Sequence, residues 1–496
     1  MIPSEQQSSI EQYTGQKLVV KAGAGTGKTS TLERYARANP TVRMLYLAFN
    51  KAIQEEAASR FPPNVLCRTT HSIAYRRIGI NYKHKLTGNW RLTDVRKYLG
   101  THDWKLAGDA IDTLNAFLAS ADVEISEHHL GKMMKVTSRQ KAHVKAVLKS
   151  AKRMWSDAID LEADFPCTHD TYLKLYALKE PELHKWVGCI LFDEAQDANP
   201  VTSSLVLSQQ CSKIFVGDDH QQIYRWRGAE NALDSFIEKE GADVLYLTQS
   251  YRFGTAIAQV ANDILAFKSL KTGSEPFALK GHTTNSTLVK ATVLREKHHC
   301  VLHRTVSGTI STALDNLDKK IYWVGGINAY NLQEILDVYY LSSGQKDKVK
   351  RKKLLTEYKG SEQYKDVAKS SGDHEMQRTV RVVGKHSAKL PNYIEHLRRN
   401  AVLHESEADL TITTAHRAKG LEWDAVIIDN DFPDLFKEDK PFSSKELADE
   451  LNLLYVSITR AICQLCPNNS VIEVRQHLEK QKKLAVLPKN KKGKGA

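Results

Sequence analysis

Short apolar runs alternate along this chain with stretches whose apolar residues recur at helical spacing. The first run, 17–21 (KLVVK), leads into a glycine-rich stretch, and residues 30–37 have helical character. Further strand-like runs occupy 44–49, 189–192, 214–217, 244–247, 411–413 and 425–428. Strands that alternate with helices predict an α/β fold with parallel sheets. In such sheets, ligands bind beyond the carboxyl ends of the strands.

Three regions depart from this alternation. Residues 81–186 have a helical pattern with no obvious strand, which predicts an inserted helical subdomain. A basic run, 346–353 (KDKVKRKK), opens a polar segment that extends to about residue 405 and holds few strand signals. The last residues, 480–496, contain seven lysines and no acidic residue. This composition predicts disorder after the last packed element.

Charge is distributed unevenly along the chain. The 496 residues include 71 Lys and Arg against 58 Asp and Glu, which gives a formal net charge of +13. The stretch 132–155 carries eight Lys or Arg and no acid. Such a run is compatible both with contact to a nucleic-acid phosphate backbone and with a solvated helix face. The total charge by itself favours nucleic acid only weakly over other acidic partners.

The sequence lacks the marks of a secreted or membrane protein. Seven cysteines, an odd number scattered through a long chain, do not predict a disulfide framework, and the CxxC of Cys463 and Cys466 has no further ligand set for zinc. No run approaches about 18 uninterrupted apolar residues, and the start has no signal-peptide pattern. We expect an intracellular protein without membrane contact, cytoplasmic and nucleoid-associated if it is prokaryotic or viral.

Residues 22–29 (AGAGTGKT) match the phosphate-loop pattern, with an alanine in the first glycine position. A strand-like run precedes the motif and a helical stretch follows, which is the context the motif requires. Glycines let backbone N–H groups converge on phosphate oxygens, the lysine neutralises phosphate charge, and the threonine hydroxyl can ligate Mg²⁺. The expected nucleotide-binding residues are Ala22, Gly23, Ala24, Gly25, Thr26, Gly27, Lys28 and Thr29.

An acidic motif, 193–197 (DEAQD), directly follows the apolar run 189–192. An aspartate at a strand end can hold Mg²⁺, and an adjacent glutamate can orient or deprotonate an attacking water. Given the phosphate loop upstream, we expect Asp193 to share a magnesium site with Thr29 and Glu194 to act on the water. The two motifs together predict a nucleotide hydrolase.

Four further clusters indicate which type of hydrolase this is. They are 216–229 (VGDDHQQIYRWRGA), 248–253 (TQSYRF), 414–423 (TAHRAKGLEW) and 455–461 (YVSITRA). With AGAGTGKT and DEAQD, in this order, they resemble the UvrD/Rep branch of superfamily 1 helicases over nearly the whole chain. The segments LAFNKAI and TTHSIAY resemble more closely the compact helicase core of the F-box DNA helicase group. No F-box precedes the motor, so that regulatory attachment is not expected.

The resemblance implies ATP and Mg²⁺ as cofactors and assigns residues around the adenosine. Gln6 resembles the glutamine that reads adenine, although Pro3 stands where the family usually has asparagine. Tyr251 resembles the aromatic residue that stacks on adenine, and Glu422 resembles the acid that contacts the ribose. Many relatives carry an arginine near the base where this chain has Ser30, which leaves the base selectivity open.

The same resemblance assigns residues around the γ-phosphate. Gln221 resembles the residue that senses the γ-phosphate and couples it to DNA. Arg252 and Arg460 resemble the two arginines that reach the γ-phosphate, one from each motor domain. A planar guanidinium suits this role because phosphoryl transfer spreads negative charge over three oxygens. ATP is expected between Lys28 and Asp193 on one domain and Arg460 on the other.

The expected DNA contacts combine aromatic and polar residues. Tyr224 and Trp226 lie two residues apart, so on an extended segment both face the same side, where they can stack on bases. Phe49 is a further stacking candidate. It immediately precedes Asn50, whereas the family pattern places Phe two residues before that asparagine, so core packing is kept as the alternative. By resemblance, the residues that bind the DNA backbone are Thr70, His71 and His416.

The resemblance implies two RecA-like motor domains with parallel sheets, each interrupted by an insertion. The expected boundaries are 1–80 and 187–270 for the first motor domain, 81–186 for its helical insertion, 271–345 and 410–480 for the second motor domain, 346–409 for a reduced second insertion, and 481–496 for a basic disordered tail.

The expected function is that of an ATP-dependent 3′ to 5′ DNA helicase or translocase in repair, recombination or replication. Its expected partners are single-stranded DNA, tailed or forked duplex DNA, and recombinase or replication proteins. An alternative is an ATP-gated translocase that strips proteins from single strands and unwinds little. A helicase-nuclease is less well supported, since no further carboxylate cluster is evident. The residue types do not exclude RNA.

Overall fold

The computed structural model of the chain describes residues 3–131, 141–225, 228–282, 286–294, 297–371, 374–437 and 441–486. Contacts divide the chain into two compact units, which we describe separately. Unit 1 comprises Met1–Ala22, Gly27–Leu247 and Asn331–Pro391, and unit 2 comprises Gly23–Thr26, Thr248–Tyr330 and Asn392–Ala496. This division is coarser than the expected domains, and it places 23–26 and 248–270 in unit 2 and 331–391 in unit 1.

A six-stranded parallel sheet lies at the centre of unit 1, in the order β3-β2-β6-β7-β1-β8. Every residue of β2 and β6 is buried, as expected for strands covered on both faces. The strands are β1 (Lys17–Ala22), β2 (Met44–Ala48), β3 (Val65–Thr69), β6 (Cys189–Phe192), β7 (Ser212–Gly217) and β8 (Asp243–Leu247). The expected parallel α/β fold is therefore confirmed.

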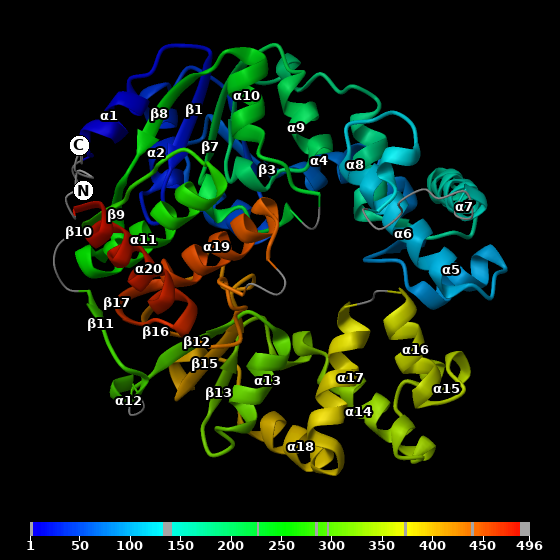
Figure 1. Cartoon of the computed structure of the whole chain (residues 1–496). Helices are drawn as coiled ribbons and strands as arrows, with labels where there is room; N and C mark the ends of the chain where they lie inside the picture. Colours follow the sequence, from blue (N-terminus) through cyan, green and yellow to red (C-terminus); the bar gives the residue numbers. More distant parts are fainter. Residues whose placement is uncertain are drawn as a thin grey trace, which may run out of the picture. The chain divides into compact units, whose positions relative to one another are not determined.

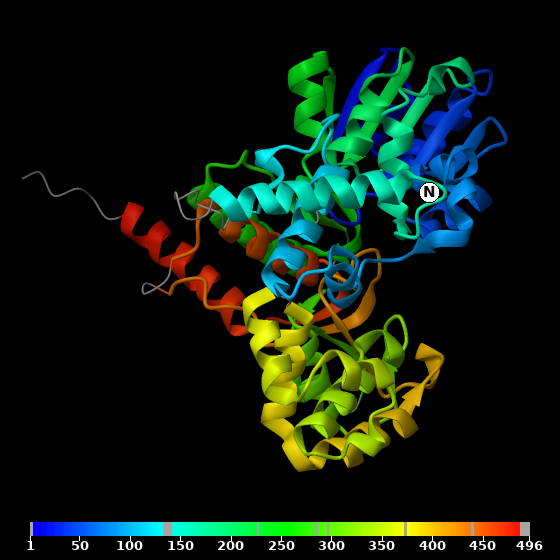
Figure 2. The ribbon, with the colours of Figure 1, turned by 90° about the vertical axis from the view of Figure 1, so that its right-hand side faces the viewer.

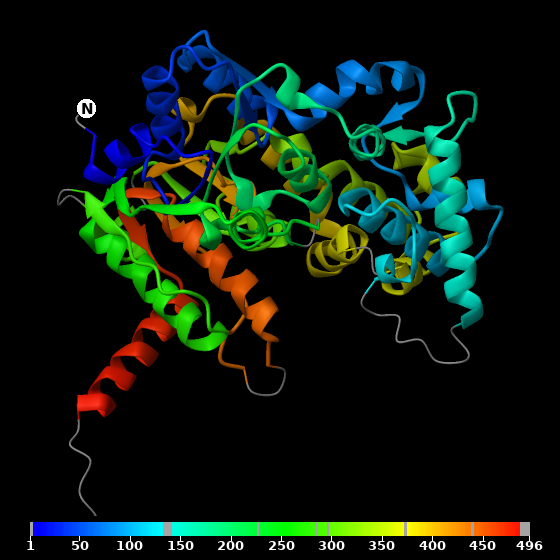
Figure 3. The same ribbon diagram turned by 90° about the horizontal axis from the view of Figure 1, so that it is seen from above.

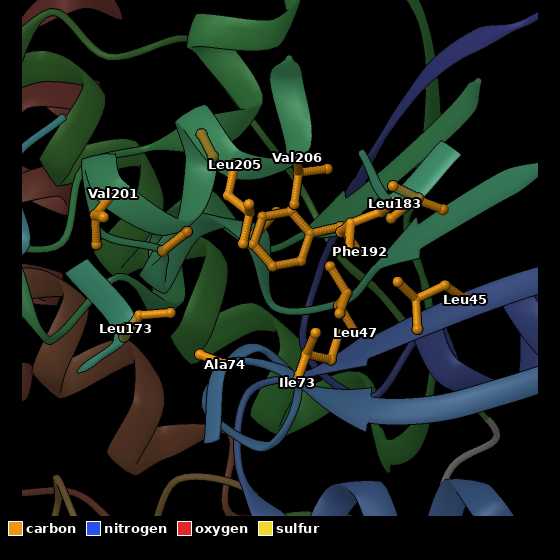
Figure 4. Packing of buried hydrophobic residues seen from close by; sticks show 14 of the residues in the cluster. Leu45, Leu47, Ile73, Ala74, Leu173, Leu183, Phe192, Val201, Leu205 and Val206 are labelled. Atoms are coloured by element: carbon orange, nitrogen blue, oxygen red, sulfur yellow. The ribbon is translucent and has the colours of Figure 1, made fainter. Parts of the chain in front are cut away.

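Helices cover both faces of this sheet (Figure 1). Alternate residues of β1 point to opposite sides, so that Leu18 and Val20 enter one apolar cluster and Val19 enters the other. Figure 4 shows the second cluster, where Phe192 packs among Leu47, Leu205 and neighbouring side chains. The helices next to the sheet are α1 (Glu5–Glu11), α2 (Lys28–Ala38), α3 (Lys51–Arg60), α4 (Thr70–Arg77), α9 (Pro200–Leu207) and α10 (Ala232–Glu240).

The region 81–186, which we expect to form a helical subdomain, is mostly helical and lies within unit 1. Its helices are α5 (Leu92–Leu99), α6 (Trp104–Ala119), α7 (Lys141–Ile159) and α8 (His169–Ala177). A short parallel pair, β4 (Leu86–Thr87) with β5 (Cys167–Thr168), was not expected. Two-residue strands carry too little hydrophobic pattern to be recognised from sequence.

A second helical group, α14 (Leu332–Ser342), α15 (Lys352–Glu357), α16 (Ser361–Ser371) and α17 (His374–His386), also belongs to unit 1 (Figure 2). It joins this unit because its apolar cluster extends onto Leu92 and Trp104 of the first helical group. The Trp104 and Tyr358 rings stack with their centroids 5.7 Å apart. Helix α18 (Leu390–Asn400) follows and contains the last residues of unit 1.

Unit 2 contains a seven-stranded sheet in the order β11-β17-β16-β12-β15-β13-β14, and its strand pairs are all parallel. The strands are β11 (Thr287–Leu288), β12 (His299–His303), β13 (Ile321–Trp323), β14 (Ala401–Val402), β15 (Leu410–Thr414), β16 (Trp423–Ile428) and β17 (Ala461–Cys466). A separate parallel pair joins β9 (Gln249–Gly254) to β10 (Lys280–His282). Cys463 and Cys466 lie on β17 as free thiols.

Helices α19 (Ser444–Ile458) and α20 (Asn469–Val486) both pack along α11 (Thr255–Thr272) in unit 2 (Figure 3). The remaining helices are α12 (Ala291–Leu294) and α13 (Val306–Leu314). Because α20 extends to Val486, residues 481–486 of the predicted disordered tail are helical instead. Residues 487–496 lie outside the described residues. No helix in the described ranges is both long and apolar enough to cross a membrane.

The basic stretch 132–155 is described only from Lys141 onward. There α7 buries Val144, Val147, Ala151 and Met154, while the side chains of Lys145 and Lys149 are exposed on the opposite face. This arrangement is compatible with both interpretations of the charge, a solvated face and a contact with phosphates.

Phe117 anchors the first helical group. It is fully buried, contacts Trp155 edge-on, and lies under the ammonium group of Lys174. We expect Phe117→Ala to lower the free energy of unfolding by about 3–5 kcal/mol, because it removes contacts and leaves a cavity. Urea denaturation measures the change. The control Val123→Ala, at a side chain that is 75% exposed, should leave stability nearly unchanged.

Candidate active site

The phosphate loop connects the carboxyl end of β1 to the first turn of α2. Gly27 is the N-cap residue of α2 and has a φ of 78°, in the left-handed region. Gly25 has a φ of 71°, and a Cβ added there would lie 2.6 Å from the Cβ of Arg252. Glycine is required at both positions because L side chains rarely adopt this backbone conformation. The loop therefore presents backbone N–H groups at the positive end of α2, where an anion is favoured.

Lys28 and Thr29, the first residues of α2, lie opposite the acidic motif after β6. The Thr29 hydroxyl donates to Asp193 Oδ2 at 2.9 Å, and Lys28 Nζ is 3.5 Å from Glu194 Oε1. Residues about 165 positions apart in sequence meet because β1 and β6 belong to the same parallel sheet. The pairing of the two motifs that the sequence predicted is thus present in unit 1.

Asp193 is almost completely buried and receives hydrogen bonds from three groups. Tyr46 Oη donates to Oδ2 at 2.7 Å, Thr29 donates to the same oxygen, and the Glu194 N–H donates to Oδ1 at 2.9 Å. Burial raises the pKa of Asp193, as does the nearby Glu194 carboxylate, while Lys28, Tyr46 and Thr29 oppose the rise. A hard cation at this carboxylate would offset the desolvation of its charge.

Glu194 occupies a strained backbone position with a φ of 51°, which is uncommon for a residue other than glycine. Strain of this kind is typical of functional sites. Its carboxylate accepts a hydrogen bond at 2.6 Å from Gln196 Nε2, which orients the side chain. The side chain remains 18% exposed. A fixed, partly accessible carboxylate is what a residue that positions an attacking water requires.

Gln221 is buried beside Asp218 at the carboxyl end of β7. Its Nε2 donates to Asp218 Oδ2 at 2.7 Å, and the Asp218 N–H donates to Gln196 Oε1 at 3.0 Å. Burial raises the pKa of Asp218, and Lys28 is near enough to oppose that rise. Gln221 is therefore connected to the acidic motif through a continuous hydrogen-bond network.

A second group of expected site residues lies within unit 2, together with the loop residues Gly23–Thr26. The Tyr251 N–H donates to Gly25 O at 2.8 Å. Arg252 donates from Nε to Glu422 Oε2 at 2.6 Å and from Nη1 to Thr459 O at 3.0 Å. Glu422, which was expected at the ribose, is thus paired with one of the two predicted phosphate-binding arginines.

Arg460, the other predicted phosphate-binding arginine, is buried within unit 2. Its Nε donates to Val456 O at 3.0 Å and its Nη1 donates to Leu421 O at 3.0 Å. The Tyr455 hydroxyl, also in the last family motif, accepts from the Ala24 N–H of the phosphate loop at 3.1 Å. The motif YVSITRA therefore packs around the loop through Tyr455, a residue for which the sequence suggested no role.

Gln7, the neighbour of the predicted Gln6, lies beside the phosphate loop. Gln7 is buried and completes a capping box with Ser4, while its Nε2 donates to Thr31 Oγ1 at 3.4 Å. A Cβ added at Gly27 would lie 3.2 Å from the same Nε2. The spacing of Ser4 and Gln7 is a capping-box signal that the sequence interpretation did not use.

Tyr251 in unit 2 and Ser30 in unit 1 occupy the positions that the family resemblance connects with the base. Tyr251 is half-buried, with its ring 5.7 Å from that of His282. Ser30, where many relatives carry an arginine, accepts a hydrogen bond at 2.9 Å from Arg60 Nη2. A guanidinium group thus reaches this position from α3, although Arg60 also pairs with Glu33.

The aromatic DNA candidates Phe49 and Tyr224 lie together in unit 1. Their rings stack with centroids 5.5 Å apart and planes 16° from parallel. Phe49 is 41% exposed, which contradicts the alternative of core packing. Trp226, the other stacking candidate, lies outside the described residues.

The polar DNA candidates differ in exposure. Thr70 is buried at the start of α4. His71 is accessible, and its Nε2 is 2.9 Å from Asp170 Oδ1. His416 is half-buried just beyond β15.

Other residues of the network were not singled out from the sequence. Tyr46 stands inside a wholly apolar strand, so its contact with Asp193 gave no signal along the chain. Asp218 and Gln196 belong to motifs that were recognised, but only the fold shows that they join these motifs.

Two family models match the chain. The model of the UvrD/REP helicase N-terminal domain matches residues 3–240, and that of the UvrD-like helicase C-terminal domain matches residues 409–465. Together they cover more than half of the chain and confirm the resemblance seen in the motifs.

Relatives agree with these models. The chain is 34% identical to F-box DNA helicase 1 of Gallus gallus over 90% of this chain and 47% of that protein. It is 30% identical to F-box DNA helicase protein 1 of Schizosaccharomyces pombe, over 95% of this chain and 58% of that protein. ATP-dependent DNA helicase PcrA of Bacillus subtilis is 28% identical over 52% of this chain and 39% of its own length.

The chain thus spans about half the length of the F-box helicase relatives that it matches. Both family models, the order of the motifs and the relatives agree on one assignment. The chain belongs to the UvrD-like helicase family.

Proposed function

We propose that this chain hydrolyses ATP with Mg²⁺ and uses the energy to move 3′ to 5′ along single-stranded DNA and to unwind tailed or forked duplexes. The observation that carries the proposal is the buried pairing of Thr29 with Asp193, with Lys28 and Glu194 alongside. The relatives' names, which include DNA helicases and an ATP-dependent DNA helicase, support the same activity.

The residues at the acidic motif fit a magnesium-nucleotide centre. Mg²⁺ prefers oxygen ligands, and the Thr29 hydroxyl and Asp193 carboxylate supply two within 2.9 Å of each other. When bound, Mg²⁺ neutralises phosphate charge during transfer. We assign Lys28 to the β and γ phosphates and Glu194 to the attacking water, which it orients and deprotonates.

Charge on the γ-phosphate also requires cationic groups. We assign this role to Arg252 and Arg460, by their places in the family motifs. Both guanidinium groups bond to carboxylate or carbonyl oxygens. ATP would replace some of these acceptors with phosphate oxygens, which match the planar fork of the arginine.

The segment 218–224 can couple ATP hydrolysis to the binding of DNA. Gln221 is held by Asp218 at the nucleotide side, and three residues later Tyr224 stacks on Phe49. We propose that bases stack on this aromatic pair and that Thr70, His71, His416 and Trp226 add contacts to the strand. Stacking tolerates any base, which suits a protein that moves along DNA.

The pathway, the protein partners and the location that we propose are inferred from the family. We propose action in repair, recombination or replication, with recombinase or replication proteins as partners, in the cytoplasm near the nucleoid if the source is prokaryotic or viral. A second candidate function is removal of proteins from single strands with little unwinding.

The decisive experiment compares strand displacement on 3′-tailed and 5′-tailed DNA and RNA duplexes, and on single strands that carry a bound protein. We expect ATP-dependent unwinding of the 3′-tailed DNA duplex. Lys28→Ala should lower kcat for ATP hydrolysis at least about 100-fold because it removes the phosphate-neutralising charge. The surface variant Lys365→Ala serves as the control. Unwinding only from 5′ tails would contradict the proposed polarity, and protein displacement without unwinding would favour the second candidate.

Tyr46→Phe tests the hydrogen bond that supports the magnesium ligand. The Tyr46 hydroxyl lowers the pKa of Asp193, so without it the carboxylate takes up a proton at higher pH. We expect the acid limb of the ATPase pH profile to move to higher pH. The Mg²⁺ concentration for half-maximal activity should rise about 3- to 10-fold, the equivalent of a hydrogen bond of about 1 kcal/mol.

Tyr35→Phe is the matched control for Tyr46→Phe, since Tyr35 is a buried tyrosine on α2 that does not contact Asp193. Equal changes in both variants would show that Tyr46 acts through packing alone.

Phe49→Ala tests the aromatic pair. Stacking on one base contributes about 1–3 kcal/mol to binding. Its loss should therefore lower the affinity for single-stranded DNA about 5- to 150-fold. ATP hydrolysis without DNA should stay near the wild-type rate. Fluorescence anisotropy and ATPase assays measure the two quantities, with Ile80→Ala as a control at another exposed apolar residue. Unchanged DNA affinity would exclude Phe49 from the DNA contact.

A further inference from the structure

Three side chains with metal-binding atoms converge in unit 2 at the carboxyl ends of two paired strands. His303 is the last residue of β12, and Asp429 directly follows β16, which pairs with β12 in parallel. The Asp429 N–H donates to Leu302 O at 2.9 Å and continues this pairing. Asp431 follows two residues later. These residues belong to none of the motifs assigned to ATP or DNA.

His303 is completely buried, yet neither of its ring nitrogens has a hydrogen-bond partner among the described residues. Its Nδ1 is 3.5 Å from Asp429 Oδ1, which is beyond a good hydrogen bond. Buried polar atoms are nearly always paired in folded proteins, because desolvation without a partner is unfavourable. An imidazole that is buried without a hydrogen bond next to a carboxylate therefore points to a ligand-binding role.

Asp431 is fixed by the start of the segment that leads into α13. Its Oδ1 accepts from the Arg304 N–H at 2.7 Å, and its Oδ2 accepts from the N–H and the hydroxyl of Thr305, each at 2.8 Å. The Asp431 N–H in turn donates to Asp429 Oδ1 at 3.0 Å. Hydrogen bonds of this kind orient carboxylate ligands in metal sites.

The position of Gly308 on α13 shows how closely these groups approach each other. A Cβ added there would lie 2.3 Å from Asp431 Oδ2 and 2.9 Å from His303 Nδ1. The carboxylate and the imidazole therefore face the same small space, and the absence of a side chain at 308 leaves that space open.

We propose that His303, Asp429 and Asp431 bind a divalent first-row transition ion such as Zn²⁺ or Mn²⁺. One ligand atom from each residue lies within 4.8 Å of the other two. In a tetrahedral ion with bonds of about 2.1 Å, two ligands are about 3.4 Å apart. The separation of 3.5 Å between His303 Nδ1 and Asp429 Oδ1 fits this geometry.

The donor set also selects the class of ion. One imidazole with two carboxylates suits Zn²⁺ and Mn²⁺, whereas Mg²⁺ is bound by oxygen ligands. The Asp429 side chain is 36% exposed, which gives the ion a route from solvent and leaves room for a water ligand.

The other group of potential metal ligands, Asp122, His128 and His129, differs in one respect. Asp122 Oδ2 already contacts His128 Nε2 at 2.6 Å and His129 Nε2 at 3.0 Å. These side chains satisfy one another and show no need for a cation, so this group provides a control.

A metal at His303 would have a structural role. The Ala415 N–H donates to His303 O at 2.8 Å, so the histidine is bonded to the segment that includes His416. An ion that joins β12, the end of β16 and the start of α13 would hold this segment in place. Metal binding and its effect on stability can be measured independently of ATP hydrolysis.

The test uses the full chain after removal of metals with EDTA and dialysis, with Zn²⁺, Mn²⁺, Co²⁺ and Mg²⁺ each added alone. We expect the unmutated chain to bind one Zn²⁺ ion more than the Asp429→Asn variant. The Tm of the unmutated chain should rise with Zn²⁺, with no comparable rise with Mg²⁺. Calorimetry should show at least 30-fold weaker Zn²⁺ binding at this site in Asp429→Asn. The control variant His128→Gln should bind Zn²⁺, and its Tm should rise with Zn²⁺, as in the unmutated chain.

Co²⁺ provides a measurement that needs no variant. Visible absorption typical of a low-coordinate Co²⁺ site with nitrogen and oxygen ligands would support the proposal. A sulfur-to-cobalt charge-transfer band as the sole signal would assign the ion to cysteines and overturn it. Equal Zn²⁺ binding by the unmutated chain and Asp429→Asn would also overturn it, as would an unmutated chain that binds no Zn²⁺ or Mn²⁺.

Discussion

The buried carboxylate of Asp193 is the constraint on which the candidate active site depends. A desolvated negative charge persists in a protein interior only when donors or cations surround it. Here the Thr29 hydroxyl, the Tyr46 hydroxyl and the Glu194 N–H converge on it. Because these donors come from α2, β2 and the turn after β6, the requirement fixes three elements relative to one another. The donors that stabilise this carboxylate therefore also hold the local fold together.

The turn after β6 shows how this requirement extends outward. Glu194 adopts a left-handed backbone conformation, which directs its N–H to Asp193 and its side chain toward Lys28. Gln196 then links Glu194 to Asp218, and Asp218 holds Gln221. A polar network of this kind is rigid when all its members are paired. It connects the acidic motif to the segment that carries Tyr224.

Unit 2 places a comparable arrangement at the ends of its own strands. Arg252 and Glu422 are paired near the phosphate loop, while the ring nitrogens of His303 lie beside two carboxylates without a hydrogen-bond partner among the described residues. The group around His303 follows from the parallel pairing of β12 with β16, because the ends of parallel strands gather side chains that are distant in sequence. The pairing of Arg252 with Glu422 balances their charges within the protein, whereas the metal ion that we propose would supply positive charge beside His303.

The sequence by itself determined the features that depend on local pattern. Apolar runs predicted the parallel sheets, and the glycines and the order of the motifs predicted the phosphate loop, the residues Thr29 and Asp193, and the helicase family. Only the tertiary structure decided which side chains complete these motifs. Tyr46 lies in a strand of otherwise apolar residues, and Gln7 faces Gly27 of the phosphate loop. It also assigned the helices of 331–391 to unit 1 and brought His303 to Asp429. These contacts join residues that are far apart in the chain. They arise from the order of the strands in the sheets, and that order leaves no local periodicity in the sequence.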